Sequence, residues 1–223
     1  MRPARTSGRV VGLMLIVQLV GLILPFVLLL PITAPDFLDG ATRVAAQVRI
    51  AVLLLLANGG LTIGISLAAL PLLRNRSETA ALGLVALSVI WFCIQAVDNA
   101  QILSMLSLSQ RYTEGGASNL EVFATSGAAL RSTRRWMHYT ELLVIDTWFF
   151  VLYGLFFRFS LVPRVLAGLG VAMVVVHMAA ITLPVFLDYR SIPALGPSLA
   201  VSHLAVAGWL LVKGVEERAS AAG

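Results

Sequence analysis

The residues of this sequence that could do chemistry lie inside apolar segments, where ionisable side chains are rare. The segment MHYTELLVIDTWFF, residues 137–150, carries His138, Glu141 and Asp146 between long hydrophobic stretches. A carboxylate at the centre of a bilayer costs at least about 2.5 kcal/mol, so such groups usually face protein or water and have polar partners. Asp146 is therefore a candidate for binding a ligand, for transferring a proton or, in a protonated form, for acting as a general acid.

A second apolar segment repeats this pattern. The sequence WFCIQAVDNAQ, residues 91–101, places Gln95, Asp98 and Asn99 at positions i, i+3 and i+4, so a helix presents all three on one face. Trp91 precedes them by about one turn. This face lies in the outer half of the predicted membrane and is a second candidate lining for a polar cavity.

Two histidines come from two further apolar stretches, His177 from VVVHMAA and His203 from AVSHLAV. At about 100° per residue, Asp146 and Tyr153 fall on the same helix face as His138. All the acids and imidazoles in these segments fall in the middle or outer half of the predicted bilayer, so we expect them to line one polar cavity that opens outward. The predicted ligand-binding residues are Trp91, Gln95, Asp98, Asn99, His138, Glu141, Asp146, Tyr153, His177 and His203.

Each of these residues also has a structural interpretation. Asp98 and Asp146 could be hydrogen-bonded struts between helices, although interhelical polar contacts contribute only about 0.6 kcal/mol on average. The histidines could be satisfied packing residues, with His138 at the membrane interface. Three histidines and three carboxylates are also zinc-ligand types, but the spacings H-x-x-x-H, H-E-x-x-H and E-x-x-H do not occur. The sequence therefore predicts no metal site and no cofactor.

The composition places the protein in a membrane. Of its 223 residues, 59% are hydrophobic and only 12% are charged, with a mean hydropathy of +0.91, whereas a soluble domain carries about 25% charged residues. The net charge of +5 comes from dispersed arginines, which argues against a nucleic-acid patch. The single cysteine, Cys93, excludes an intramolecular disulfide. The sequence contains neither a Walker A motif nor G-x-S-x-G.

Six apolar stretches are long enough to cross a bilayer, since a spanning helix needs roughly 20 mostly apolar residues. Lipid offers no hydrogen-bond partner to a bare backbone, which favours helices, and the stretches are too long for barrel strands. The sequence therefore predicts an all-α integral membrane bundle in a single domain, residues 1–223. The six predicted helices cover about 10–31, 48–73, 80–109, 136–158, 163–186 and 196–214.

The connections between these helices carry arginines on both sides of the membrane. The short connections 74–79 and 158–164 and both termini are predicted to be cytoplasmic, because positive charge in short loops sets orientation. The longest connection, 110–135, is predicted to lie outside. The run Arg-Arg-Trp at 134–136 is interpreted as an interfacial anchor, with an anion site as the alternative. The N-terminal apolar run of about 20 residues exceeds the 7–15 of a signal peptide and predicts an uncleaved span.

The second half of the chain resembles a known family. His138 near the start of the fourth predicted span and Gly154 near its end are two of the matching positions. The connection LVPR at 161–164 and the closing run Trp209–Gly214 are two more. These motifs are similar to those of a bacterial family of multi-pass membrane proteins that is carried as a domain of unknown function. The resemblance covers residues 130–218; it implies a six-helix bundle in a bacterial inner membrane and supplies no activity.

Together these observations predict a bacterial inner-membrane protein whose polar cavity accepts a small or amphiphilic ligand. Asp98 and Asp146 are its central carboxylates and the candidates for proton transfer and catalysis, and His177 and His203 are the predicted hydrogen-bonding or charge partners of these acids. An alternative from another class is an intramembrane enzyme that uses one of these acids on a lipid or isoprenoid, and a third is a structural or accessory protein. The expected partners are the lipid bilayer and a lipid or small amphiphile, and not nucleic acid.

Overall fold

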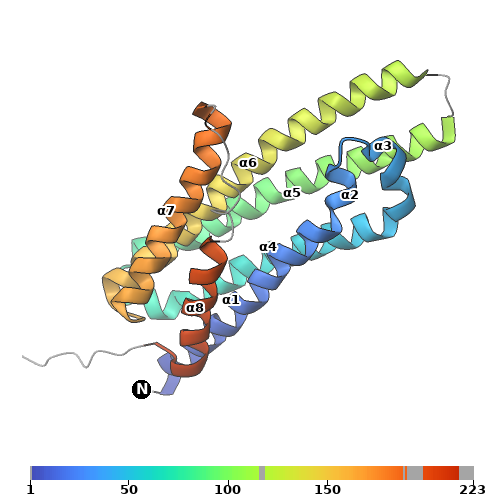
Figure 1. Ribbon diagram of the computed structural model, residues 1–223. Helices are drawn as coiled ribbons and strands as arrows, with labels where there is room; N and C mark the ends of the chain where they lie inside the picture. Colours follow the sequence, from blue (N-terminus) through green and yellow to red (C-terminus); the bar gives the residue numbers. More distant parts are fainter. Residues whose placement is uncertain (1, 116–118, 188, 190–197, 216–223) are drawn as a thin grey trace, which may run out of the picture. The chain divides into compact units, whose positions relative to one another are not determined.

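The described chain is built from helices. The computed structural model describes residues 2–115, 119–187, 189 and 198–215, and every regular element in these ranges is helical, which confirms the all-α prediction. In chain order the elements are α1 (Arg2–Leu28), α2 (Leu30–Thr33), α3 (Phe37–Gly40), the 3-10 helix η1 (Ala41–Val44), α4 (Ala45–Arg74), α5 (Glu78–Gly115), α6 (Leu120–Phe159), α7 (Arg164–Leu187) and α8 (Ser198–Lys213) (Figure 1).

Five helical segments of the described chain are long and apolar enough to cross a membrane. They are Arg5–Leu28 in α1, Phe37–Arg74 across α3, η1 and α4, and the whole of α5, α6 and α7. The sixth predicted span, 196–214, corresponds to α8, whose 16 residues fall short of the roughly 20 that a spanning helix needs. Residues 196–197 of that prediction lie outside the described ranges. The helices define a multi-pass arrangement, and the sixth span stays a prediction.

The prediction of a long connection at 110–135 is wrong. Helix α5 continues to Gly115 and α6 already begins at Leu120. Hydropathy marks only the apolar part of a helix, whereas helix formers such as alanine, leucine and arginine continue it beyond that part. At 1.5 Å per residue, the 40 residues of α6 extend about 60 Å, twice the roughly 30 Å of hydrocarbon in a bilayer.

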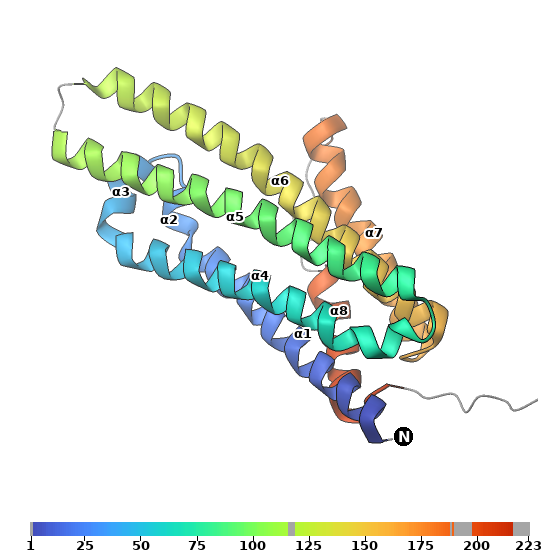
Figure 2. The same ribbon diagram turned by 180° about the vertical axis from the view of Figure 1, so that it is seen from behind.

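The described residues form two compact units, of which unit 2 comprises 20–60 and 91–142. Its core includes the buried side chains of Leu29, Ile32, Phe37, Val48, Ile102 and Met105. Polar contacts fasten α3 and η1 to α5, because Ser109 Oγ donates to the Leu38 carbonyl oxygen at 2.8 Å and accepts from the Thr42 N–H at 3.1 Å. Within unit 2, the parts of α5 and α6 that belong to it run side by side in both views (Figures 1 and 2).

Unit 1 comprises the described parts of residues 1–19, 61–90 and 143–223. Buried polar pairs join helices that are far apart in the sequence. Gln18 Nε2 donates to Thr62 Oγ1 at 2.6 Å, and Trp148 Nε1 donates to Ser66 Oγ at 2.9 Å. Such bonds between spanning helices satisfy polar groups that lipid cannot solvate.

The first and last helices of unit 1 pack with their backbones in contact. A Cβ added at Gly12 would lie 2.6 Å from the Leu211 nitrogen, which is closer than real Cβ atoms come. Glycine is therefore needed here, as small residues are at other close helix interfaces in membranes. At the end of α8, Arg5 Nε donates to the Lys213 carbonyl oxygen at 3.1 Å, and Arg9 Nη2 donates to the preceding carbonyl at 3.2 Å. Side chains of α1 thus satisfy carbonyl groups that the last turn of α8 leaves open.

Candidate functional site

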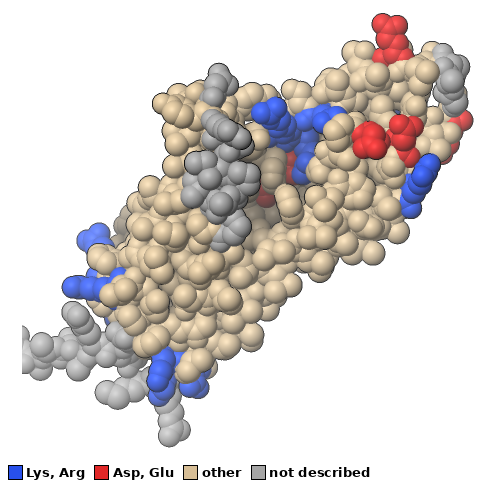
Figure 3. Space-filling view, in the orientation of Figure 1, with Lys and Arg blue, Asp and Glu red and all other residues tan. Residues whose placement is uncertain are grey.

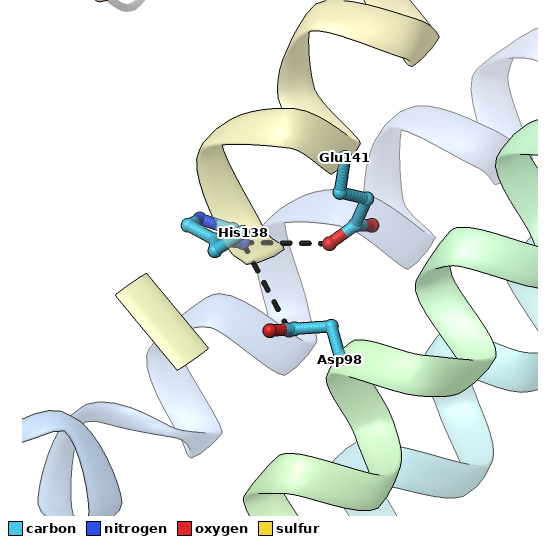
Figure 4. Close-up of side chains that lie close together, drawn as sticks. All are labelled: Asp98, His138 and Glu141. Carbon is cyan, nitrogen blue, oxygen red and sulfur yellow. Dashed lines mark hydrogen bonds and ion pairs between the residues drawn. The ribbon is translucent and has the colours of Figure 1, made fainter. Parts of the chain in front are cut away.

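Three ionisable side chains of unit 2 come together between α5 and α6. Asp98 comes from α5, and His138 and Glu141 come from α6 (Figure 4). His138 Nδ1 lies 3.4 Å from Glu141 Oε2 and 4.0 Å from Asp98 Oδ2. Both acids are buried, while a third of the His138 side chain is exposed. Two carboxylates therefore face one imidazole nitrogen in a largely enclosed position.

Helix periodicity explains how α6 contributes to this group. Arg134, His138 and Glu141 are spaced i, i+4 and i+7, so they lie on one face of the helix. Arg134 Nη2 lies 3.6 Å from Asp98 Oδ2 and gives the buried carboxylate a positive neighbour. From the sequence, this arginine is predicted to be part of an interfacial anchor, with an anion site as the alternative. The shared face with two predicted site residues is the signal that would have placed it in the site.

A pocket of about 460 Å³ lies within unit 2 and adjoins the carboxylate group, because His138 and Arg134 are part of its lining. Basic, aromatic and hydroxyl side chains make up most of the remaining wall: Arg131, Arg135, Trp136, Tyr139, Ser132 and Thr33. Figure 3 shows arginine or lysine side chains gathered over α6. Three arginines around one pocket favour the binding of an anion.

Three more of the predicted residues lie along α5 beside Asp98. Trp91, Gln95 and Asn99 are at most 3% exposed. Within the described residues, the Trp91 indole nitrogen and both side-chain amides have no hydrogen-bond partner. A Cβ added at Gly59 would lie 2.5 Å from Gln95 Oε1, so the backbone of α4 passes close to this amide. Buried polar groups normally have hydrogen-bond partners. Three residues with unpaired polar groups along one face of α5 therefore distinguish this face from ordinary apolar packing.

In unit 1, Asp146 of α6 is paired with His177 of α7. His177 Nδ1 lies 2.8 Å from Asp146 Oδ2 and 3.0 Å from Oδ1. The aspartate is fully buried, and 17% of the histidine side chain is exposed. An ionised carboxylate only accepts hydrogen bonds, so Nδ1 carries the hydrogen when the aspartate is ionised. The pair can hold a proton and exchange it between carboxylate and imidazole.

Tyr153 and His203 form a second buried pair in unit 1. The Tyr153 hydroxyl lies 2.8 Å from His203 Nδ1, and His203 Nε2 lies 2.9 Å from the Leu15 carbonyl oxygen. A carbonyl only accepts, so Nε2 carries a hydrogen, and in the neutral ring Nδ1 accepts from the tyrosine hydroxyl. Both ring nitrogens are thus bonded within the chain, and the pair links α1, α6 and α8.

The ten predicted ligand-binding residues therefore fall into two groups. Six belong to unit 2: Trp91, Gln95, Asp98, Asn99, His138 and Glu141. Four belong to unit 1: Asp146, Tyr153, His177 and His203. Each group contains acid–imidazole or hydroxyl–imidazole contacts of its own. The single cavity expected for all ten residues stays a prediction.

Long apolar helices with ionisable side chains buried along them define a helical, multi-pass membrane protein. Residues 10–214 match the family described as "Domain of unknown function (DUF4386)", and the chain belongs to this family. The match confirms the resemblance to a family carried as a domain of unknown function and extends it over the first half of the chain. No curated protein and no solved structure matches the chain.

Proposed function

We propose that this protein is a bacterial inner-membrane protein that binds a small anionic amphiphile in the pocket of unit 2. In this arrangement α8 is the sixth span, both termini are cytoplasmic and the pocket is at the outer membrane interface. The five apolar segments and the arginines of the short connections 74–79 and 158–164 support this topology.

The lining of the pocket is the observation that carries the proposal. A volume of about 460 Å³ falls within the roughly 300–1,000 Å³ usual for small-molecule sites. Arg131, Arg134 and Arg135 suit a phosphate or carboxylate, since a guanidinium can bind such a group through two parallel hydrogen bonds. Trp136 and Tyr139 are residue types that gather at the membrane interface, at the level of lipid head groups. An amphiphile with an anionic head group matches both properties.

Replacing Arg135 with glutamine is expected to weaken the binding of an anionic lipid about tenfold. Arg135 is exposed, lines the pocket and packs 5.7 Å from the centre of the Tyr139 ring, so the change removes one charge without opening the core. A hydrogen bond to a charged group contributes roughly 1.5–3 kcal/mol, enough for a tenfold effect. Native mass spectrometry of the detergent-purified protein, titrated with phosphatidylglycerol, measures the affinity.

The matched control is Arg111→Gln, which removes an exposed arginine of α5 that is not part of the pocket. Its affinity is expected to stay within about twofold of the wild type, because isolated surface charges contribute little. Equal losses in the two variants would contradict the proposal. So would wild-type protein that binds phosphatidylcholine as tightly as phosphatidylglycerol.

A cysteine at Ser132 is expected to react with a membrane-impermeant maleimide in intact spheroplasts, whereas one at Ser77 is expected to react only after the membrane is opened. Ser132 is exposed in the pocket lining, and Ser77 lies in the α4–α5 connection. Both cysteines are introduced into a Cys93→Ser background, which removes the native thiol. Labelling in the opposite order would show that the proposed orientation is inverted. If the labelling order is as expected, a reporter fused to the C-terminus that is found in the periplasm would show an odd number of spans.

A second candidate function is an intramembrane enzyme that acts on a lipid or isoprenoid by carboxylic-acid catalysis. The pairing of Asp146 with His177 favours it, since an acid in contact with an imidazole can lose a proton and regain it. In this function Asp146 donates a proton to the substrate and His177 restores it. If the isosteric substitution Asp146→Asn leaves the activity unchanged, the role of the pair is purely structural.

A further inference from the structure

The group formed by Asp98, His138 and Glu141 has the ligand types and spacing of a divalent-metal site. Each residue offers one ligand atom, and the three atoms lie within 4.8 Å of one another. A tetrahedral zinc ion with bonds of about 2.0–2.2 Å holds its ligand atoms roughly 3.3–3.5 Å apart. The 3.4 Å from His138 Nδ1 to Glu141 Oε2 matches this separation, and the 4.0 Å to Asp98 Oδ2 is slightly longer. The oxygens of the two carboxylates lie within 4.8 Å of each other, so binding of the ion would draw the aspartate towards the other two ligands.

The burial of Asp98 distinguishes this group from a solvated cluster of acids. Asp98 is 2% exposed, and its Oδ1 has no hydrogen-bond partner among the described residues. Buried charges are usually paired or coordinate a metal. Arg134 lies 3.6 Å from the other oxygen, which is longer than the roughly 2.7–2.9 Å of a direct charge-assisted hydrogen bond. The arginine therefore offsets part of the charge of the carboxylate and leaves ligand capacity on its oxygens.

The charge of the group also fits a divalent cation. A metal ion binds an imidazole through a nitrogen that carries no proton, so in the metal-bound group the two carboxylates exceed the single positive charge of Arg134. A divalent ion would turn this excess into one positive charge, which an anion in the adjacent pocket would balance. Away from bulk water these attractions are much stronger than in solution.

The pocket gives such an ion a route of entry and an open coordination position. His138 belongs both to the group and to the pocket lining, so the ion lies at the pocket wall. Three protein ligands with an open fourth position are typical of catalytic zinc, whereas structural zinc has four protein ligands. The usual zinc-ligand spacings do not reveal this set, because its two α6 ligands have the order His-x-x-Glu and the third comes from α5.

We propose that Asp98, His138 and Glu141 bind one Zn²⁺ or a similar divalent transition-metal ion. His138 Nδ1 and one oxygen of each carboxylate are the ligands, and the fourth position is open to the pocket of unit 2. This site goes beyond the proposed binding of an amphiphile and does not depend on it.

The test is metal binding by the full-length protein, purified in mild detergent, stripped with a chelator and titrated with Zn²⁺ and Co²⁺. One ion per chain is expected, with the intense visible absorption of tetrahedral Co²⁺. In competition with a chromogenic chelator, His138→Ala and Glu141→Gln are each expected to weaken Zn²⁺ binding by about 100-fold or more. The matched control Glu121→Gln removes an exposed carboxylate from the start of the same helix and is expected to keep wild-type affinity.

Thermal unfolding provides a readout that does not require every variant to be equally stable. Zn²⁺ is expected to raise the unfolding temperature of the wild type and of Glu121→Gln, but not that of His138→Ala. Wild-type protein that takes up no stoichiometric metal, or ligand variants that bind Zn²⁺ as Glu121→Gln does, would overturn the site. Arg135→Gln is expected to keep its Zn²⁺ affinity while losing anionic lipid, so the two proposals can fail separately.

Discussion

Replacing His177 with alanine is expected to lower the free energy of unfolding by about 3–5 kcal/mol. The change removes His177 Nδ1, which lies 2.8 Å from Asp146 Oδ2, so the fully buried carboxylate of Asp146 loses this hydrogen-bond partner. Replacing both residues with leucine is expected to recover most of this loss, because a well-packed apolar pair does not need a polar partner. Equilibrium unfolding in mixed detergent and dodecyl sulfate micelles measures the difference.

The control for this experiment is Thr182→Ala on the same helix, whose hydroxyl donates only within its own helix, to the Met178 carbonyl oxygen at 2.8 Å. A loss in His177→Ala no greater than in this control would show that the Asp146 pair does not stabilise the fold.

The isosteric Asp146→Asn variant separates a proton-transferring role of Asp146 from a purely structural one. The asparagine amide oxygen still accepts a hydrogen bond from Nδ1–H, so stability is expected to change by about 1 kcal/mol or less. An activity that needs a proton from position 146 is lost, because the amide does not titrate.

Replacing Gly12 with alanine is expected to destabilise the protein by about 1–3 kcal/mol. The added methyl carbon would lie 2.6 Å from the Leu211 nitrogen and 2.8 Å from the Ala207 oxygen. These are backbone atoms of α8, so the steric clash is removed only when the two helices move apart, and not when a side chain turns. Bulkier valine at the same position is expected to cost more. The same unfolding measurement in mixed micelles gives both values.

Gly208→Ala in α8 is the matched control for this substitution. A Cβ at Gly208 meets no atom within 4 Å, so alanine there is expected to be neutral or to stabilise the helix by up to about 1 kcal/mol. If the two substitutions had the same effect, the close approach of α1 to α8 would not be the reason for glycine at position 12.

Hydropathy and length are sufficient to predict an all-helical membrane protein and the positions of its apolar helices. They do not predict where α5 ends and where α6 begins, because the polar extensions of these helices are stabilised by helix propensity and by contacts such as that of Arg131 Nη1 with the Pro35 carbonyl oxygen at 3.0 Å. The same limit applies to α8. Its apolar composition predicts a helix, but its 16 residues leave the sixth span open.

The candidate site could be predicted in part from residue type and burial cost. Ionisable residues in apolar segments identify Asp98 and Asp146 without reference to any structure. His177 and His203 are the partners that the sequence predicts for these acids, and the contact of His177 with Asp146 is found, whereas His203 bonds to Tyr153 and to the Leu15 carbonyl oxygen. Which histidine meets which acid depends on which helices are neighbours, and the sequence carries no such information. The contact of Asp146 with His177 joins two helices, and that of Asp98 with Arg134 required the register of α6 against α5. Spacing along one helix could have placed Arg134 beside His138, but only contacts across helices identify the acid that it faces.

The contact between α1 and α8 also has a consequence for synthesis of the protein. Arg5 and Arg9 bond to carbonyls more than 200 residues away in the sequence, and the Leu15 carbonyl meets His203. At roughly 5–20 residues per second, the ribosome makes the remaining chain over about 10–40 s. Throughout that time the newly inserted first helix lacks its final neighbour. A nascent chain that stalls before α8 therefore lacks the helix that packs against the Gly12 face of α1.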